Sequence, residues 1–436
     1  MSLDRRAAPA VTTPPVPGPT GSLAAADSVS SVTPEPVPRP RGREAGRTGA
    51  DVVRVEGWAR TPFEALADVF ARVVAEQGDG AAALAIYLDG HPVVDLSSGG
   101  PRDARYLLFS VSKGVSAIAA QHAHADGRLD LDAPICDVWP AMRRTATRRI
   151  TTRHVLTHRA GLPVVDRKLT LEDHVAGRLE AALERQEPYW EPGTRHGYHA
   201  ITYGALLDGV FQRALGTSVA EYIHAHLRHP LGLDLALGVP PSDSHDVLPL
   251  RTRPPMRTPL QSARPGPLFD AVGLGLLDDP SVFNQPDVLA APWPATNVVA
   301  GAHALARLYA ATVGPVDDVR LLDSESSAAL ARTRSIGLDE VLGEPSHFGS
   351  GVQRPTARLP LLGPDSYGHD GHAGSLALAD PRFSVGMAFT TNVSPPVGGA
   401  SAAALTLIAA TRHCLNTSGR NAYLEKMSRP DRPPVA

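Results

Sequence analysis

The sharpest chemical signal in the sequence is a serine placed three residues before a lysine, at Ser110 and Lys113. The pattern predicts a helix that begins at Ser110, with Val111, Val115 and Ile118 on its apolar stripe. Positions i and i+3 share one face of a helix, so the amine can reach the hydroxyl. A serine becomes a good nucleophile when a neighbour accepts its proton, and a lysine does so once its pKa is lowered. The pair therefore predicts nucleophilic catalysis by Ser110, with Lys113 as proton acceptor.

A serine at the start of a helix has a second use. Its backbone N–H has no partner within the helix and, together with the helix dipole, suits a developing oxyanion. Acyl transfer is therefore the chemistry that Ser110 favours. The structural alternative is a plain N-cap serine followed by a solvated lysine, because S-x-x-K occurs by chance in many proteins.

The rest of the chain must supply the frame that positions this helix. Each end of the chain shows strand patterns and one helix pattern. The predicted segments are a helix from Thr61, strands over 83–88, 92–96, 375–379 and 383–391, and a helix over 402–415. We expect the two ends to share one antiparallel sheet with helices on its faces, an α/β fold class.

The chain also divides by composition. Residues 1–50 are rich in proline, alanine and serine and predict a disordered extension. We expect one folded domain over 52–420, with a mostly helical subdomain at about 125–313. The proline-dense segment Val239–Pro267 is a lid or binding rim, or else a loose surface excursion.

Charge and hydropathy exclude several kinds of partner. Of 436 residues, 43% are hydrophobic and 20% charged, and the net charge is −3. We therefore expect neither a nucleic-acid partner nor a membrane partner. No apolar run reaches the roughly 18 residues that span a bilayer, and no secretion signal is recognisable, so a cytoplasmic protein is predicted.

No cofactor or metal is expected. His154 and His158 are four residues apart but lack the glutamate of H-E-x-x-H, and no phosphate-binding loop or G-x-S-x-G elbow is present. Cys136 and Cys414 have no metal spacing; small buried side chains are the favoured interpretation, and a bridge between them stays open.

Five blocks in chain order resemble the serine β-lactamase and penicillin-binding-protein superfamily, in particular its class C-like esterases, the family VIII lipolytic enzymes. The blocks are Phe109–Pro140, Ile150–Leu162, Trp190–Tyr198, His229–Leu233 and Tyr367–Ser375. The resemblance covers roughly residues 55–415. It implies a β-lactamase/transpeptidase-like fold, with an antiparallel sheet flanked by helices and a mostly helical subdomain.

The resemblance also implies roles for single residues. Ser110 is the nucleophile and Lys113 its proton partner, while Tyr198 takes the place of the tyrosine in the family's Y-x-N motif. Tyr198 would share the proton with Lys113 and pass it to the leaving group. His369-Asp370-Gly371 takes the place of K-T-G, and the N–H of His372 would complete the oxyanion hole with that of Ser110.

Four positions on the substrate side differ from the usual family pattern. Ala200 stands where lactamases have asparagine, and His369 stands where they have lysine. Asp370 and His372, on either side of Gly371, are also unusual. Because side chains alternate across a strand, we expect His369 to face the pocket and Asp370 to pair on the outer face.

These observations leave several functions open. The first is a hydrolase or acyltransferase for small-molecule carboxylic esters or thioesters, including a biosynthetic transacylase that forms an amide or ester. The second is a D-Ala-D-Ala carboxypeptidase or β-lactamase, which Ala200, His369 and the missing export signal disfavour. The third, a non-catalytic binding protein, is disfavoured by the intact Ser110, Lys113 and Tyr198. The oligomeric state is not predicted.

Overall fold

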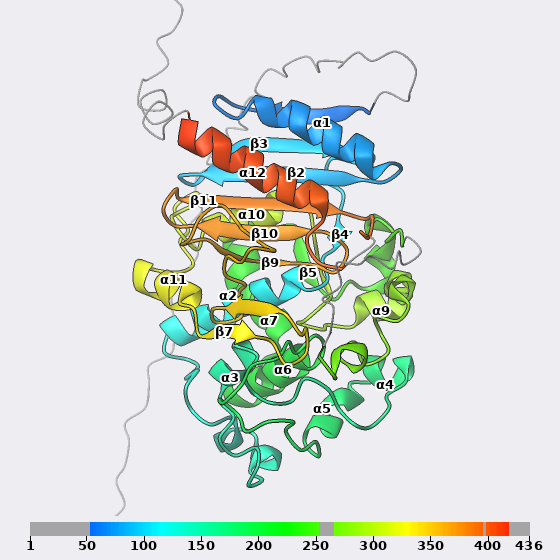
Figure 1. Ribbon diagram of the computed structural model, residues 1–436, viewed down its shortest axis with the longest axis vertical. Coiled ribbons are helices and arrows are strands. Elements are labelled where there is room, and N and C mark those ends of the chain that lie inside the picture. Colours follow the sequence, from blue (N-terminus) through cyan, green and yellow to red (C-terminus); the bar gives the residue numbers. More distant parts are fainter. Residues whose placement is uncertain (1–52, 253–265, 396–397, 418–436) are drawn as a thin grey trace, which may run out of the picture. The chain divides into compact units, whose positions relative to one another are not determined.

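The computed structural model describes residues 53–252, 266–395 and 398–417 (Figure 1). The extension predicted over residues 1–50 lies outside the described residues, and so do residues 253–265 of the proline-dense segment.

One six-stranded antiparallel sheet joins the two ends of the chain (Figure 1). Its strands are β1 (Val55–Ala59), β2 (Ala82–Leu88), β3 (His91–Ser98), β9 (Tyr367–Asp370), β10 (Leu376–Asp380) and β11 (Val385–Thr391). Their order across the sheet is β1-β3-β2-β11-β10-β9, so the N-terminal and C-terminal strands meet where β2 pairs with β11. The predicted fold class, with both ends in one sheet, is confirmed.

The two faces of the sheet differ in side-chain size. Along β2, Leu84, Ile86 and Leu88 face the layer made by α1 (Ala65–Gln77) and α12 (Ala402–Thr417). The alternate residues of β2 face α2 (Val111–Ala125) and α10 (Ala302–Ala310) instead, and most of them are alanines. Since side chains alternate along a strand, both faces are buried and the sheet lies between two helical layers.

Small residues let α10 lie close to the sheet. A Cβ on Gly386 of β11 would come within 2.3 Å of the Ala306 carbonyl oxygen and 2.4 Å of the Ala310 nitrogen. The backbone of α10 therefore rests directly on β11. The interval predicted as mostly helical, 125–313, accordingly contains one helix that packs on the sheet.

The remaining α-helices, apart from α6, and the remaining strands are short. The helices are α3 (Thr152–Leu156), α4 (Leu171–Val175), α5 (Arg178–Leu183), α6 (Thr202–Leu215), α7 (Val219–Ile223), α8 (His229–Leu231), α9 (Pro286–Ala290) and α11 (Ser324–Ala331). Two small antiparallel sheets are β4 (Tyr106–Leu107) with β6 (Val298–Ala300) and β5 (Leu235–Leu237), and β7 (Ser335–Leu338) with β8 (Pro345–Phe348).

Three local predictions can be compared with the structure. The first helix begins at Ala65 and not at Thr61, because the Thr61 hydroxyl bonds the Glu64 side chain and caps no backbone N–H. Cys136 and Cys414 are buried free thiols, as the favoured interpretation expected. Within the described ranges, no helix is both long and apolar enough to cross a membrane.

Replacing Gly386 with alanine should destabilise the protein, because the added methyl group collides with the backbone of α10. Overpacking of this kind costs about 1–3 kcal/mol of unfolding free energy. Urea denaturation followed by circular dichroism measures the loss. Gly314→Ala is the matched control, since a Cβ there meets nothing within 4 Å. Equal stability of both variants would contradict the close packing of α10 on β11.

Candidate active site

Ser110 lies at the turn between β4 and α2. It is the N-cap of α2, yet its side chain makes no capping hydrogen bond, so its hydroxyl is available for other partners. The preceding residue, Phe109, has a φ of 46°, a left-handed conformation that is costly for a bulky residue. The rings of Phe283 and His372, with centroids 4.8 and 5.7 Å away, hold Phe109 in place. Packing thus fixes the turn that presents Ser110.

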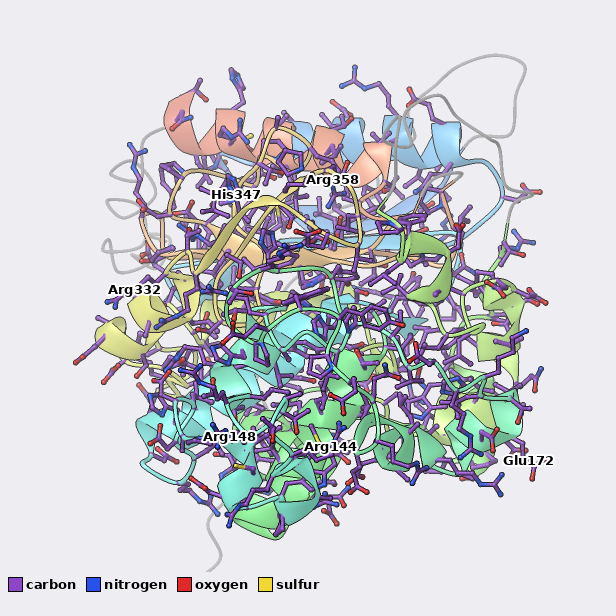
Figure 2. The ribbon with its side chains drawn as sticks, turned by 60° about the horizontal axis from the view of Figure 1, so that its bottom comes forward. Arg144, Arg148, Glu172, Arg332, His347 and Arg358 are labelled. Atoms are coloured by element: carbon purple, nitrogen blue, oxygen red, sulfur yellow. The ribbon has the colours of Figure 1, made fainter. Side chains whose placement is uncertain are left out.

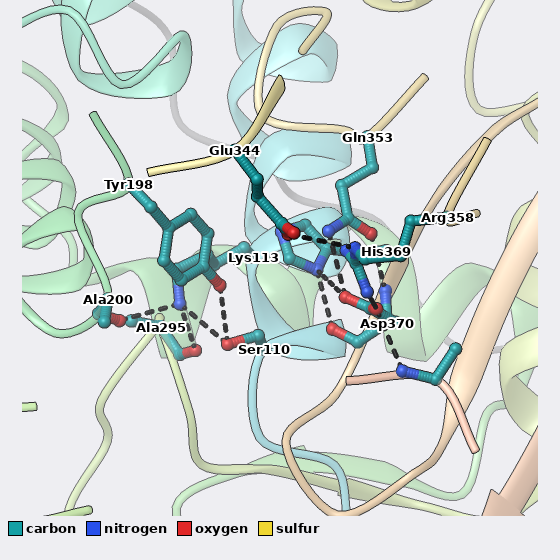
Figure 3. Close-up of polar contacts among 11 residues, drawn as sticks. Ser110, Lys113, Tyr198, Ala200, Ala295, Glu344, Gln353, Arg358, His369 and Asp370 are labelled. Carbon is teal, nitrogen blue, oxygen red and sulfur yellow. Dashed lines mark hydrogen bonds and ion pairs between the residues drawn. The ribbon is translucent and has the colours of Figure 1, made fainter. Parts of the chain in front are cut away.

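Lys113 is completely buried one helical turn into α2. Its Nζ donates to the backbone carbonyls of Ala200 (2.7 Å) and Ala295 (3.0 Å) and lies 3.1 Å from Ser110 Oγ (Figure 3). Burial lowers the pKa of Lys113 to about 7, and the negative charge of Asp370 only partly opposes this shift. The alternative of a solvated lysine is therefore wrong.

Tyr198 meets Ser110 from the other side. Its hydroxyl donates to Ser110 Oγ at 2.8 Å (Figure 3). The phenol ring stacks on Phe348, with centroids 6.1 Å apart, and Lys113 Nζ lies 5.0 Å from the ring centroid. Burial raises the pKa of Tyr198, an effect that the hydrogen bond to Ser110 only partly offsets. The phenol is therefore neutral near pH 7 and acts as a donor.

The position of Tyr198 depends on a buried carboxylate that the sequence did not reveal. Asp339 Oδ1 accepts hydrogen bonds from the backbone N–H groups of Tyr198 (2.9 Å) and Val341 (3.0 Å). Its Oδ2 accepts from the hydroxyl of Ser346 at 2.9 Å. Asp339 therefore ties the segment that carries Tyr198 to the β7–β8 hairpin.

His369 of β9 faces the catalytic residues. Its ring is fully buried, and its centroid is 6.2 Å from that of Tyr198. Nδ1 donates to the backbone carbonyl of Asp370 at 2.7 Å, which leaves Nε2 as an acceptor with no hydrogen-bond partner among the described residues. Burial lowers the pKa of His369 to about 4, so the imidazole is neutral near pH 7.

Asp370, the next residue on β9, forms an ion pair as expected, but it is buried, and its Oδ1 lies 3.8 Å from His369 Nδ1. Its carboxylate accepts from Gln353 Nε2 (2.9 Å), Arg358 Nη1 (3.1 Å) and the backbone N–H of Ala400 (2.9 Å). Burial favours the neutral acid, but Arg358, His369 and these hydrogen bonds outweigh it and lower the pKa of Asp370 to about 2. Asp370 is thus a buried anion engaged with the protein itself.

Gly371 and His372 bring the end of β9 against the nucleophile turn. A Cβ on Gly371 would lie 2.3 Å from the carbonyl oxygen of Leu108, so only glycine allows this approach. The ring of His372 then packs on Phe109. The backbones before Ser110 and after Asp370 are therefore neighbours, as a shared oxyanion hole requires.

Several contributing groups had no signal in the sequence. Ala200 was expected at a substrate position, but the group it contributes is the carbonyl that holds Lys113. Ala295 contributes a second carbonyl to the same amine. A backbone carbonyl carries no side-chain signature, so neither contribution can be recognised from residue type. His154 and His158 do not form a pair: Thr151 N–H caps onto His154, and His199 N–H bonds His158.

Replacing Asp339 with alanine should destabilise the protein and lower kcat, because buried backbone N–H groups lose their acceptor and Tyr198 loses its anchor. The expected loss is about 2–3 kcal/mol of unfolding free energy. Urea denaturation and steady-state kinetics on an ester measure both effects. Ser346→Ala, which removes only one of the donors to Asp339, is the control and should lose less of both. Full activity in Asp339→Ala would show that Tyr198 does not depend on this anchor.

Comparisons with known proteins identify the family to which this fold belongs. The family described as Beta-lactamase matches residues 66–411. The esterase/beta-lactamase LipL of Mycobacterium tuberculosis is 31% identical over 380 residues, which cover 80% of this chain and 84% of LipL.

Solved structures share the fold. EstA from Arthrobacter nitroguajacolicus Rue61a has a TM-score of 0.75 and 30% identity, covering 82% of this chain and 98% of EstA. A family VIII carboxylesterase also has a TM-score of 0.75, at 24% identity, covering 83% of this chain and 100% of its own. The resemblance seen in the motifs is thereby confirmed, and the chain belongs to the Beta-lactamase family.

Proposed function

We propose that this serine hydrolase acts on carboxylic esters or thioesters through an acyl-enzyme on Ser110. The observation that carries the proposal is that Ser110 Oγ lies within hydrogen-bond reach of both Lys113 Nζ (3.1 Å) and Tyr198 Oη (2.8 Å). One group is a buried amine and the other a neutral phenol. Together they give a serine hydroxyl a base and a hydrogen-bond donor.

Lys113 is the base in this proposal. Two of its N–H bonds are directed at the carbonyls of Ala200 and Ala295, so the lone pair of the neutral amine faces Ser110. As Oγ attacks the carbonyl carbon, the hydroxyl proton moves to Nζ. The resulting ammonium keeps all its acceptors, because the two carbonyls remain in place.

The oxyanion of the tetrahedral intermediate would be bound by the backbone N–H groups of Ser110 and His372. Both belong to the segments that meet at Gly371 and Leu108. The start of α2 adds its dipole to the same charge. Gly371 is therefore needed for the close approach of the two backbone segments. The side chains of Asp370 and His372 are not required for this step.

Collapse of the intermediate needs a proton on the leaving oxygen or sulfur. The Lys113 ammonium can return the proton through Tyr198, whose hydroxyl already bonds Ser110. Because burial raises the pKa of Tyr198, the phenol gives up its proton only as it receives another from Lys113. Water, or an acceptor alcohol or amine, then attacks the acyl-enzyme by the reverse path.

The names of the relatives support an esterase, and one name also includes β-lactamase. LipL is named as both an esterase and a β-lactamase, and EstA and the carboxylesterase share the fold. Against lactam or D-Ala-D-Ala substrates stands the side chain of Ala200, which offers no amide. His369, neutral near pH 7, offers no positive charge to a substrate carboxylate.

Three substitutions test the roles of the catalytic residues. Ser110→Ala should abolish turnover and labelling by a fluorophosphonate, since it removes the nucleophile. Lys113→Ala and Tyr198→Phe should each lower kcat by roughly 10²–10⁴, and their effects should not multiply because both act on one proton.

Tyr203→Phe is the matched control, because Tyr203 also lies against Lys113 but bonds only its backbone carbonyl. It should lose less than about tenfold. Labelling of another serine in Ser110→Ala, or a double-variant loss equal to the product of the single losses, would contradict the scheme.

Substrate preference tests the reaction class. Small esters should be turned over much faster than penicillin-type or D-Ala-D-Ala substrates, because each missing contact to the latter costs about 1–3 kcal/mol. We would compare kcat/KM for p-nitrophenyl butyrate, nitrocefin and a diacetyl-Lys-D-Ala-D-Ala peptide on one preparation. A kcat/KM for nitrocefin or the peptide that equals the ester value would favour a β-lactamase or D-Ala-D-Ala carboxypeptidase instead.

A further inference from the structure

Beside the catalytic residues, Arg358 is bound on one side by a buried carboxylate and is partly exposed to solvent. Arg358 Nη1 lies 3.1 Å from Asp370 Oδ2. The side chain of Asp370 is 7% exposed, whereas that of Arg358 is 45% exposed. Gln353 and the N–H of Ala400 hold the other lone pairs of Asp370. The buried carboxylate therefore fixes the guanidinium, while much of the arginine still faces outward.

A second carboxylate contacts the exposed part of Arg358. Glu344, on the loop between β7 and β8, places Oε1 3.4 Å from Arg358 Nε and is 35% exposed. Figure 3 shows the two side chains pointing toward one another, with His369 and Asp370 next to them. Glu344 thus makes the contact that an incoming carboxylate would make with this arginine.

Arg358 is linked to the catalytic residues through Asp370. Asp370 directly follows His369, and Gly371 touches the backbone of Leu108 just before the nucleophile turn. Burial dominates the pKa of Tyr198, but the positive charge of Arg358 is near enough to act against it.

The segment that carries Arg358 is also bound to the β7–β8 hairpin. Arg354 N–H donates to the carbonyl of His347 at 2.9 Å, and His347 Nδ1 bonds the carbonyl of Pro355 at 3.1 Å. Figure 2 shows His347 and Arg358 on the same face of the molecule. Both members of the Glu344–Arg358 pair are therefore held in place by one hairpin.

The charges near the site then favour neutral substrates. In direct contact with the Arg358 guanidinium, Asp370 and Glu344 carry two negative charges against its single positive charge. His369 is neutral near pH 7 and adds no positive charge. An approaching carboxylate meets an excess of negative charge, and the arginine that would bind it already has two partners.

We propose that Glu344 is a specificity determinant whose carboxylate occupies the anion-binding position offered by Arg358, so that the enzyme selects uncharged acyl substrates over carboxylate-bearing ones. This inference rests on the proposed esterase function. It assigns Arg358 a latent anion subsite, which Glu344 keeps filled. The alternative is a surface ion pair without effect on substrate choice, as many such pairs are.

The test compares charged and uncharged members of matched ester pairs. One pair is p-nitrophenyl hydrogen adipate and its methyl ester, with the charge on the acyl side. The other is p-(butanoyloxy)benzoate and its methyl ester, with the charge on the leaving group. The readout is the ratio of kcat/KM for the anionic and the neutral member, so a general loss of activity cancels.

Glu344→Gln should raise this ratio roughly tenfold for at least one pair, the worth of about one charge-assisted hydrogen bond. The gain should disappear in the double variant that also carries Arg358→Gln. Glu340→Gln is the matched control: it removes an equal charge from the same loop, but Glu340 pairs with Arg195 at 3.6 Å. The ratio for Glu340→Gln should stay within about twofold of the parent value, since a charge that does not contact Arg358 is screened by solvent and salt.

Two results would overturn the proposal. One is an unchanged ratio in Glu344→Gln for both pairs. The other is a gain that survives Arg358→Gln, which would mean that charge alone, and no subsite, is responsible. The rates at which a neutral and a carboxylate-bearing fluorophosphonate label Ser110 give the same ratio without turnover. Failure of the esterase proposal is therefore distinguishable from failure of this one.

Discussion

The site depends on the complete burial of one lysine amine. In water Lys113 would be protonated near pH 7 and useless as a base, but burial lowers its pKa to about 7. The cost of burying the amine is limited by the carbonyls of Ala200 and Ala295, which accept two of its N–H bonds. The third direction leads to Ser110. A single buried group thus sets both the charge state and the aim of the base.

The fold places the elements that surround the buried Lys113 amine. The sheet built from both ends of the chain carries β9 to its edge, where Gly371 meets the backbone of Leu108 and His369 closes one side of the site. Asp339 holds Tyr198 from the β7–β8 hairpin. The same hairpin brings Glu344 to Arg358, so the segment that fixes the phenol also supplies a partner for this arginine.

Spacing and alternation made part of this arrangement predictable. Ser110 and Lys113 share a helix face at i and i+3, and the strand patterns at both ends of the chain required a common sheet. The position of His369 beside Tyr198 agrees with strand alternation. The contributions of Ala295, Asp339 and Arg358 were missed, because each acts through a backbone carbonyl or a contact between distant segments. Nothing in residue type or local spacing distinguishes such a residue from its neighbours.

The most direct test of the central claim is the pH dependence of Ser110 labelling by a small neutral fluorophosphonate. A base must be deprotonated to act, so the second-order rate should rise with pH and level off above an apparent pKa of about 7, the value set by burial of Lys113. Lys113→Ala should abolish that rise. A rate that rises only near pH 10.4, the approximate pKa of a lysine in water, would contradict the account, as would a rate without pH dependence.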